Sequence, residues 1–103
     1  MSEPMRIRAR LEAGRCQVAV LIEHEMENGL RKGTDGALVP AWYVKRVQAD
    51  LNGQRVFDAR WGPSVSKNPM LRFSLREGQL GDRITVTWLD NRGHTRTDHA
   101  LVA

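Results

Sequence analysis

Residues 83–90 read Arg83-Ile84-Thr85-Val86-Thr87-Trp88-Leu89-Asp90, and this stretch decides the fold class. Its alternation of polar and apolar side chains places Ile84, Val86 and Trp88 on one face of an extended chain. A helix would instead repeat its apolar residues every three or four positions. Residues 91–94, Asn-Arg-Gly-His, form a turn signal directly afterwards. The pattern therefore predicts a half-buried strand that turns into a neighbouring strand.

Six further stretches alternate in the same way or are rich in β-branched and aromatic residues. They are residues 6–11, 16–23, 42–50, 55–60, 71–76 and 95–102. Val44 and Val47 lie three positions apart in one of them, and a β-bulge would bring both to the same face. Asn52-Gly53 predicts a hairpin between residues 42–50 and 55–60.

No stretch has the period of an amphipathic helix, and short strands separated by turns are typical of a sandwich. We therefore predict one all-β domain over residues 1–103, an immunoglobulin-like or fibronectin type III-like antiparallel β-sandwich of about seven strands. Cys16 is the only cysteine, so no disulfide within the chain can pin the two sheets together. Its position beside Val18 and Val20 on one strand face predicts that the thiol packs inward.

Residues 24–41 show no clear period and contain glycines and a proline, which predicts a long loop or a hairpin excursion. Loops of this length in compact domains are usually functional or mobile. His24, Glu25 and Glu27 have no metal-ligand spacing, and the other histidines lie far along the chain. We expect these three side chains to be solvated.

A second interruption covers residues 61–70, where two prolines and a glycine exclude regular structure. Trp61 opens this loop, Val65 lies inside it, and Lys67 is its only charge. These contact groups are consistent with a binding role. The alternative is a stiff connection between two sheets in which Trp61 simply fills the core.

Catalytic chemistry is missing from the sequence pattern. No nucleophile stands beside a base, and no pair of carboxylates or set of metal ligands is recognisable. Asp82, Asp90 and Asp98 fall near turns or on polar faces, where we expect them to be solvated. The sequence predicts no enzyme activity, no cofactor and no metal.

The net charge of +4 raises the question of a nucleic-acid partner. Arg6, Arg8 and Arg10 share one face of a predicted edge strand, but charged side chains there also discourage pairing with a second molecule. The other cations are spread along the chain and mixed with 12 acidic residues. A basic nucleic-acid-binding β-domain and a small redox carrier that uses Cys16 remain alternative functions.

The loop string Trp61-Gly62-Pro63-Ser64-Val65-Ser66-Lys67-Asn68-Pro69 is long and unusual. Together with residues 24–32, 40–43, 81–82 and 88–93, it resembles the SoxZ family of the bacterial sulfur-oxidation system. The likeness spans nearly the whole chain. Two positions depart from the family pattern, namely Asn28, where threonine is common, and Trp42, where histidine is common.

This resemblance implies a non-catalytic, immunoglobulin-like scaffold subunit that pairs with a SoxY-like subunit. That partner carries sulfur intermediates covalently on a C-terminal Gly-Gly-Cys-Gly-Gly arm and presents them to thiosulfate-oxidising enzymes. The family acts in the periplasm. Charged residues interrupt any apolar signal-peptide core in residues 1–13, so we expect export together with a signal-bearing partner.

We expect the partner-facing surface to combine the loop with part of the long excursion. The predicted partner-binding residues are Met26, Leu30, Arg31, Lys32, Trp61, Pro63, Val65, Lys67 and Asn68. For the two apolar residues of the excursion, Met26 and Leu30, the alternative is that they cap one end of the sandwich.

Overall fold

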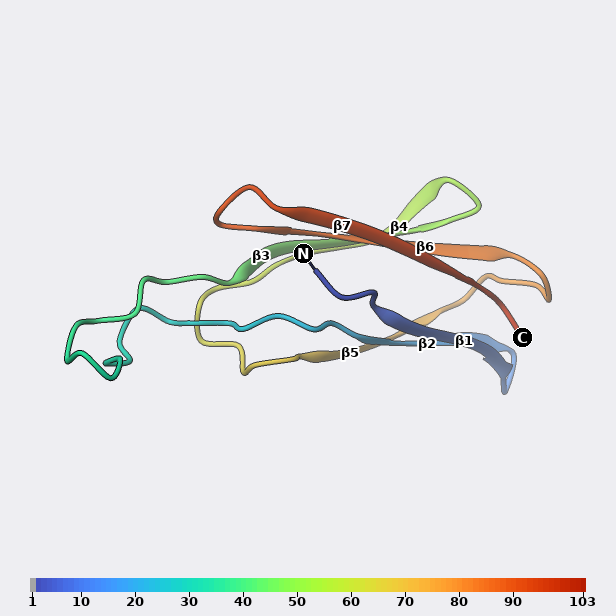
Figure 1. Ribbon diagram of the computed structural model, residues 1–103. Helices are drawn as coiled ribbons and strands as arrows, with labels where there is room; N and C mark the ends of the chain where they lie inside the picture. Colours follow the sequence, from blue (N-terminus) through green and yellow to red (C-terminus); the bar gives the residue numbers. More distant parts are fainter. Residues whose placement is uncertain (1) are drawn as a thin grey trace.

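The computed structural model describes residues 2–103 and consists of seven antiparallel strands in two facing sheets (Figure 1). This arrangement confirms the predicted all-β sandwich. The strands are β1 (Arg6–Glu12), β2 (Arg15–Leu21), β3 (Val44–Leu51), β4 (Gln54–Arg60), β5 (Met70–Leu75), β6 (Arg83–Asp90) and β7 (Thr95–Leu101).

One sheet has the order β1-β2-β5 and the other the order β4-β3-β6-β7. The predicted hairpin joins β3 to β4, and the positive φ angles of Asn52 (51°) and Gly53 (84°) match a tight two-residue turn. The predicted bulge is present where the register of β3 against β6 shifts between Val44 and Arg46. As a result Val44 and Val47 are both fully buried.

The core lies between β2 of one sheet and the β3–β6 pair of the other. Alternate residues of these strands are buried, because successive side chains point to opposite faces. Its largest fully buried apolar side chains are Trp88, Ile22, Ile84, Val20, Val44, Val47 and Val86. Strand β3 begins two residues later than the predicted range of 42–50, since Trp42 and Tyr43 precede the regular ladder.

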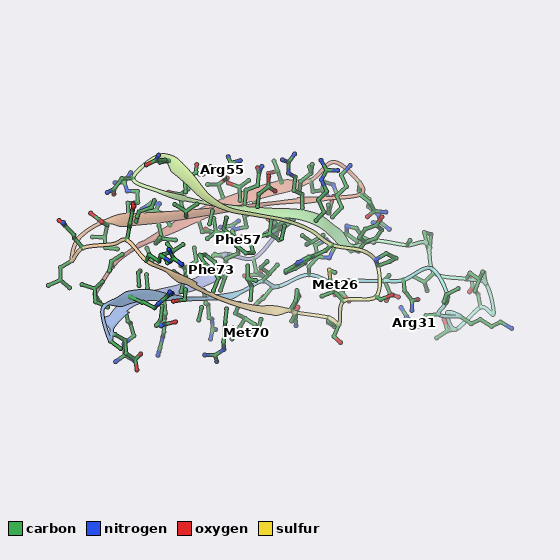
Figure 2. All side chains as sticks on the ribbon, turned by 180° about the vertical axis from the view of Figure 1, so that it is seen from behind. Met26, Arg31, Arg55, Phe57, Met70 and Phe73 are labelled. Atoms are coloured by element: carbon green, nitrogen blue, oxygen red, sulfur yellow. The ribbon has the colours of Figure 1, made fainter. Side chains whose placement is uncertain are left out.

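The two long sides of the sandwich close differently. On one side β1 lies against β7, and the end of the chain joins β1 through hydrogen bonds from Ala103 N to Ala9 O and from Leu11 N to Ala103 O. On the other side the apolar residues of β4 and β5 are half-buried, apart from the exposed Met70. Phe57 and Phe73 stack there with ring centroids 4.6 Å apart (Figure 2). Stacking between the sheets therefore covers a side that no backbone ladder closes.

Residues 25–43 leave the sandwich as a narrow hairpin extension that projects from one end (Figure 1). Two isolated antiparallel bridges hold its limbs together, Glu27 with Trp42 and Lys32 with Leu38. The hairpin extension gives the molecule its elongated dimensions of 52 × 23 × 20 Å. Of the two predictions for this region, the hairpin excursion is confirmed. Within residues 2–103, no helix is long and apolar enough to span a bilayer.

Candidate functional site

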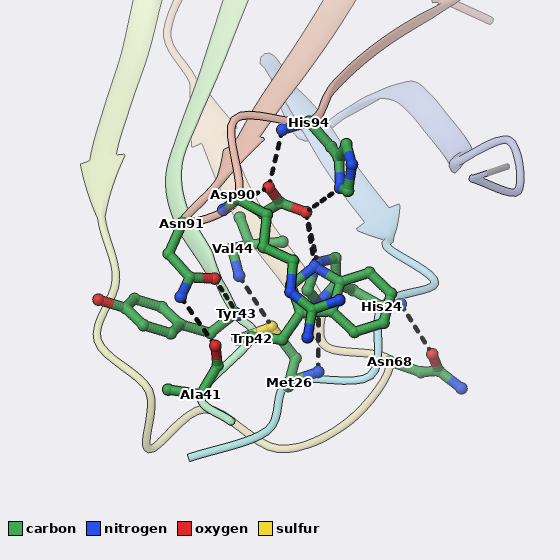
Figure 3. Close-up of polar contacts among 11 residues, drawn as sticks. His24, Met26, Ala41, Trp42, Tyr43, Val44, Asn68, Asp90, Asn91 and His94 are labelled. Atoms are coloured by element: carbon green, nitrogen blue, oxygen red, sulfur yellow. Dashed lines mark hydrogen bonds and ion pairs between the residues drawn. The ribbon is translucent and has the colours of Figure 1, made fainter. Parts of the chain in front are cut away.

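Asp90, the last residue of β6, is the centre of a polar cluster at the base of the hairpin extension (Figure 3). Its Oδ2 atom lies 2.8 Å from Trp42 Nε1, 3.2 Å from His24 Nε2 and 3.2 Å from His94 Nδ1. Its Oδ1 atom accepts hydrogen bonds from the backbone N–H groups of Arg92 and His94. The side chain is fully buried, so these five donors replace its hydration.

The protonation state of Asp90 follows from these contacts. Burial by itself raises the pKa of the carboxyl group, but hydrogen bonds from Trp42, His24 and two backbone amides lower the pKa further than burial raises it. The net direction is below the ordinary value, and the carboxylate is ionised at neutral pH. Our prediction that Asp90 is solvated was wrong. It continues the inward face of Ile84, Val86 and Trp88, and this period could have revealed its burial.

His24 was also predicted to be solvated, and this prediction was wrong. The residue is buried, with only 7% of its surface exposed. Its Nδ1 atom accepts the backbone N–H of Met26 at 3.2 Å, so Nε2 carries the proton and donates to Asp90. Trp42 and Trp88 each pack against its ring in an edge-to-face arrangement. Its neighbour Glu25 is exposed, as expected.

The cluster does not form a metal centre. No group of three or more histidine, cysteine, aspartate or glutamate side chains in residues 2–103 is arranged to hold a metal ion. Glu27, the third residue considered as a ligand, instead bonds to Arg31 four positions along the chain.

An open cavity of about 710 Å³ lies over the cluster. It is lined by Ser2, Glu3, Glu23, His24, Glu25, Trp42, Lys67, Asn68, Trp88, Asp90, Arg92, His94 and Thr95. The guanidinium of Arg92 stacks on the Trp42 ring, 4.2 Å from its centroid. The indole nitrogen of Trp88 is buried without an acceptor among the described residues. The cavity walls therefore combine aromatic side chains, hydrogen-bond donors and carboxylates.

The loop of residues 61–70 forms one wall of this cavity through its last third. Asn68 N donates to His24 O at 3.0 Å, and His24 N donates to Asn68 Oδ1 at 2.9 Å. Ile22 N also donates to Pro69 O, so this end of the loop prolongs the pairing of β2 with β5. Lys67 reaches the carboxylate of Glu25 at 3.4 Å. The structure thus brings Asn68 to His24 of the polar cluster and Lys67 to the wall of the cavity.

The first half of the loop packs against the core, as the stiff connection between the sheets predicts. Trp61 and Val65 are half-buried and pack against the core, while Pro63 is also half-buried. The backbone N–H of Trp61 donates to Lys45 O, which fixes the start of the loop beside β3. These side chains therefore connect the sheets and still leave part of their surface accessible.

The predicted residues of the hairpin extension separate into two groups. Met26 is buried at its base, where the sulfur accepts the backbone N–H of Val44, so its side chain caps the end of the sandwich. Leu30 is 77% exposed, and Arg31 and Lys32 beside it are exposed as well. Leu38 on the opposite limb is 59% exposed and was not predicted. Leu38 pairs with Lys32 across the hairpin and therefore lies on the same surface.

Cys16 is fully buried and free, which confirms that its thiol packs inward. Burial raises the pKa of the thiol, and the nearby charge of Asp82 raises it further. A high pKa and lack of access both reduce the reactivity of a thiol. The alternative of a redox carrier based on Cys16 therefore gains no support.

Comparison with protein-family models decides the family. The model described as sulphur oxidation protein SoxZ matches residues 5–100, which include β1 to β6, all of β7 except its last residue, and the whole polar cluster. The chain belongs to the SoxZ family. This membership confirms the resemblance and implies a role in sulfur oxidation together with other Sox proteins. SoxZ proteins are generally non-catalytic subunits. No curated protein matches the chain.

Proposed function

We propose that this chain is the non-catalytic scaffold subunit of a heteromeric sulfur carrier. It pairs with a SoxY-like subunit and presents the sulfur intermediates bound to that partner to thiosulfate-oxidising enzymes. The observation that carries the proposal is the family match over residues 5–100. We place this complex in the periplasm and expect the signal-bearing partner to direct its export.

The single thiol of the chain supports the division of labour. Covalent transfer of sulfur requires an accessible thiolate, and Cys16 has no exposed surface. A second subunit must therefore supply the carrier cysteine. The contribution of this chain is then to hold that cysteine in position and to provide recognition surfaces.

The exposed part of the hairpin extension is the best candidate for the partner-binding surface. Leu30 and Leu38 expose most of their apolar area there, and the burial of such residues drives association. Arg31 and Lys32 add positive charge, which favours a partner with an acidic surface. The loop residues Trp61, Pro63, Val65, Lys67 and Asn68 form the second part of the proposed surface.

Native mass spectrometry of the chain, produced with and without the cysteine-bearing subunit, tests the proposal. We expect a stable complex, and after thiosulfate and the sulfur-transfer enzymes are added, a sulfur adduct on the partner's cysteine alone. Failure of the two subunits to associate, or an adduct on Cys16, would overturn the proposal.

A further inference from the structure

His94 has one ring nitrogen that the protein uses and one that it leaves free. The Nδ1 atom lies 3.2 Å from Oδ2 of Asp90. An ionised carboxylate can only accept a hydrogen bond, so Nδ1 carries a proton and Nε2 keeps its lone pair. No described residue bonds to Nε2, and the side chain is 61% exposed where it lines the cavity. Asp90 therefore orients His94 as a base that faces the cavity.

Two hydrogen-bond donors of the same cavity are also uncommitted. The guanidinium of Arg92 rests on Trp42 and forms no ion pair with any carboxylate of residues 2–103. The indole N–H of Trp88, which lines the cavity and is 2% exposed, has no acceptor among the described residues. Of the two donors, the guanidinium of Arg92 is the accessible one, since the indole nitrogen of Trp88 is fully buried. A base in the same cavity can accept a proton from a ligand, and Arg92 can then stabilise the resulting anion.

The acidity of a ligand relative to the imidazole of His94 indicates which class of ligand the site accepts. Imidazole side chains ionise near pH 6.5 and thiols near pH 8.5, a difference of about two units that a protein environment can overcome. Alkyl hydroxyl groups are far weaker acids, and carboxylic acids have already lost their proton at neutral pH. Sulfur also packs favourably against aromatic rings such as Trp42 and Trp88. The cavity thus fits a thiol better than these other acids.

We propose that Asp90, His94 and Arg92 form a proton-accepting site for a thiol that is supplied by another chain. The S–H bond breaks heterolytically, the proton moves to His94 Nε2, and sulfur keeps the electron pair as a thiolate. Arg92 stabilises this thiolate, while Asp90 stabilises the imidazolium. The identity of the donor chain rests on the proposed function, in which the carrier cysteine of the partner enters the cavity.

His94 shares the cavity with several other titratable groups. The titratable groups that line the cavity are Glu3, Glu23, His24, Glu25, Lys67, Asp90 and Arg92. Carboxylates outnumber cations among them, and Lys67 is paired with Glu25. Arg92 is then the cation available to stabilise the thiolate. The thiolate and the imidazolium of His94 therefore have different partners, Arg92 and Asp90.

The position of the cavity also suits a thiol from outside. Lys67 and Asn68, which belong to the proposed partner-binding surface, form part of its wall. A partner that docks on the loop of residues 61–70 would therefore place a flexible segment beside His94. The cavity volume of about 710 Å³ leaves room for a side chain with its neighbouring backbone.

The rate at which iodoacetamide alkylates the partner's cysteine tests this site, because only the thiolate reacts. The measurement uses the assembled complex between pH 5 and pH 10, with His94→Gln as the variant and His99→Gln as the control. Glutamine keeps a donor for Asp90, and the backbone bond from residue 94 to Asp90 is retained. His99 is exposed on β7 and does not line the cavity.

We expect His94→Gln to raise the apparent pKa of the partner's thiol by about one unit, which slows alkylation at pH 7 about eightfold. His99→Gln should leave the profile unchanged. Equal profiles for all three complexes would overturn the proposal, as would an equal shift in both variants. Matching urea midpoints for the three proteins would show that the difference does not come from unfolding.

A second measurement separates this proposal from the proposed function. The peptides Gly-Gly-Cys-Gly-Gly and Gly-Gly-Ser-Gly-Gly are titrated into the chain alone at pH 7, with ¹⁵N-labelled histidines observed by NMR. We expect only the cysteine peptide to move Nε2 of His94 toward the protonated shift. If no complex forms with the partner, the proposed function fails, and the peptide comparison alone decides whether a thiol site exists. Identical responses to the two peptides would then overturn it.

Discussion

The Nε2 atom of His24 lies 3.2 Å from Oδ2 of Asp90, although 66 positions separate the two residues in the chain. This contact ties the end of β2 to the end of β6, and so joins the two sheets where the hairpin extension begins (Figure 3). Both side chains are buried, which makes the interaction sensitive to the loss of either partner. The base of the hairpin extension therefore depends on a polar contact inside the sandwich.

Replacing Asp90 tests this dependence. In Asp90→Asn an amide NH2 group replaces one carboxylate oxygen, and it cannot accept the hydrogen bonds that this oxygen accepted. We therefore expect the free energy of unfolding to fall by about 2–4 kcal/mol. Urea unfolding followed by tryptophan fluorescence measures the change. Asp58→Asn is the matched control, because Asp58 also accepts side-chain hydrogen bonds, from Arg46, but is 41% exposed. An equal midpoint for both variants would show that the buried cluster does not stabilise the fold.

The stability of the protein should depend on pH through the same carboxylate. The pKa of Asp90 is lower in the folded protein than its ordinary value, as is that of Asp98. A group with a depressed folded pKa stabilises the protein above its unfolded pKa of about 3.9, and this stabilisation is lost as the pH falls through the folded pKa. We expect urea midpoints to fall below about pH 4. Asp90→Asn should lose less stability than the parent between pH 5 and pH 2, and parallel curves would contradict this assignment.

The hairpin extension offers a direct test of partner binding. Leu30 and Leu38 are highly exposed, so the double substitution Leu30→Asp and Leu38→Asp should leave folding intact. We expect it to weaken binding to the cysteine-bearing subunit at least tenfold, because apolar contact is lost and acidic groups are introduced near an acidic partner. Isothermal titration calorimetry measures the affinity. Leu80→Asp is the control, since Leu80 is 71% exposed outside the proposed surface. If this control weakened binding as strongly, the assignment of the surface would be wrong.

Gly78 is required by the packing of Cys16. A Cβ atom at this position would lie 2.9 Å from the Cys16 Cβ, and the φ angle of 141° is one that other residues rarely adopt. We expect Gly78→Ala to lower the free energy of unfolding by at least about 2 kcal/mol, from steric conflict and backbone strain together. Gly14→Ala has open space around the added carbon, with φ at 77°, and should cost about 1 kcal/mol. Thermal unfolding of both variants provides the comparison, and similar losses would contradict the steric contribution.

The fold class could be predicted from the sequence because every second side chain of a strand points to the same face of the sheet. The alternation of Ile84, Val86 and Trp88 predicted β6 with its observed bounds, and Asn52-Gly53 predicted the hairpin between β3 and β4. The three-residue step between Val44 and Val47 even predicted a bulge. All of these features are local, and they follow from residues that are neighbours in the sequence.

The site could be predicted only in part. The unusual string around Pro63 and Lys67 pointed to the loop, and the structure places Lys67 and Asn68 beside the cavity. Leu38 was missed, because only the pairing of the two hairpin limbs places it near the predicted residues. Met26 was predicted to face a partner, yet its side chain is covered by the base of the hairpin extension.

The amino-acid sequence alone was enough to predict the strands, the face of most of their apolar side chains and the family, since each depends on local pattern or on a contiguous string. Only the tertiary structure decided that His24, Asp90 and His94 share one carboxylate oxygen. A buried polar group needs hydrogen-bond partners, and here they come from distant segments of the chain. No periodic pattern in the sequence indicates which segments these are. The packing of two sheets brought these groups together, and hydrogen bonds from both sheets then stabilised a charge inside the sandwich.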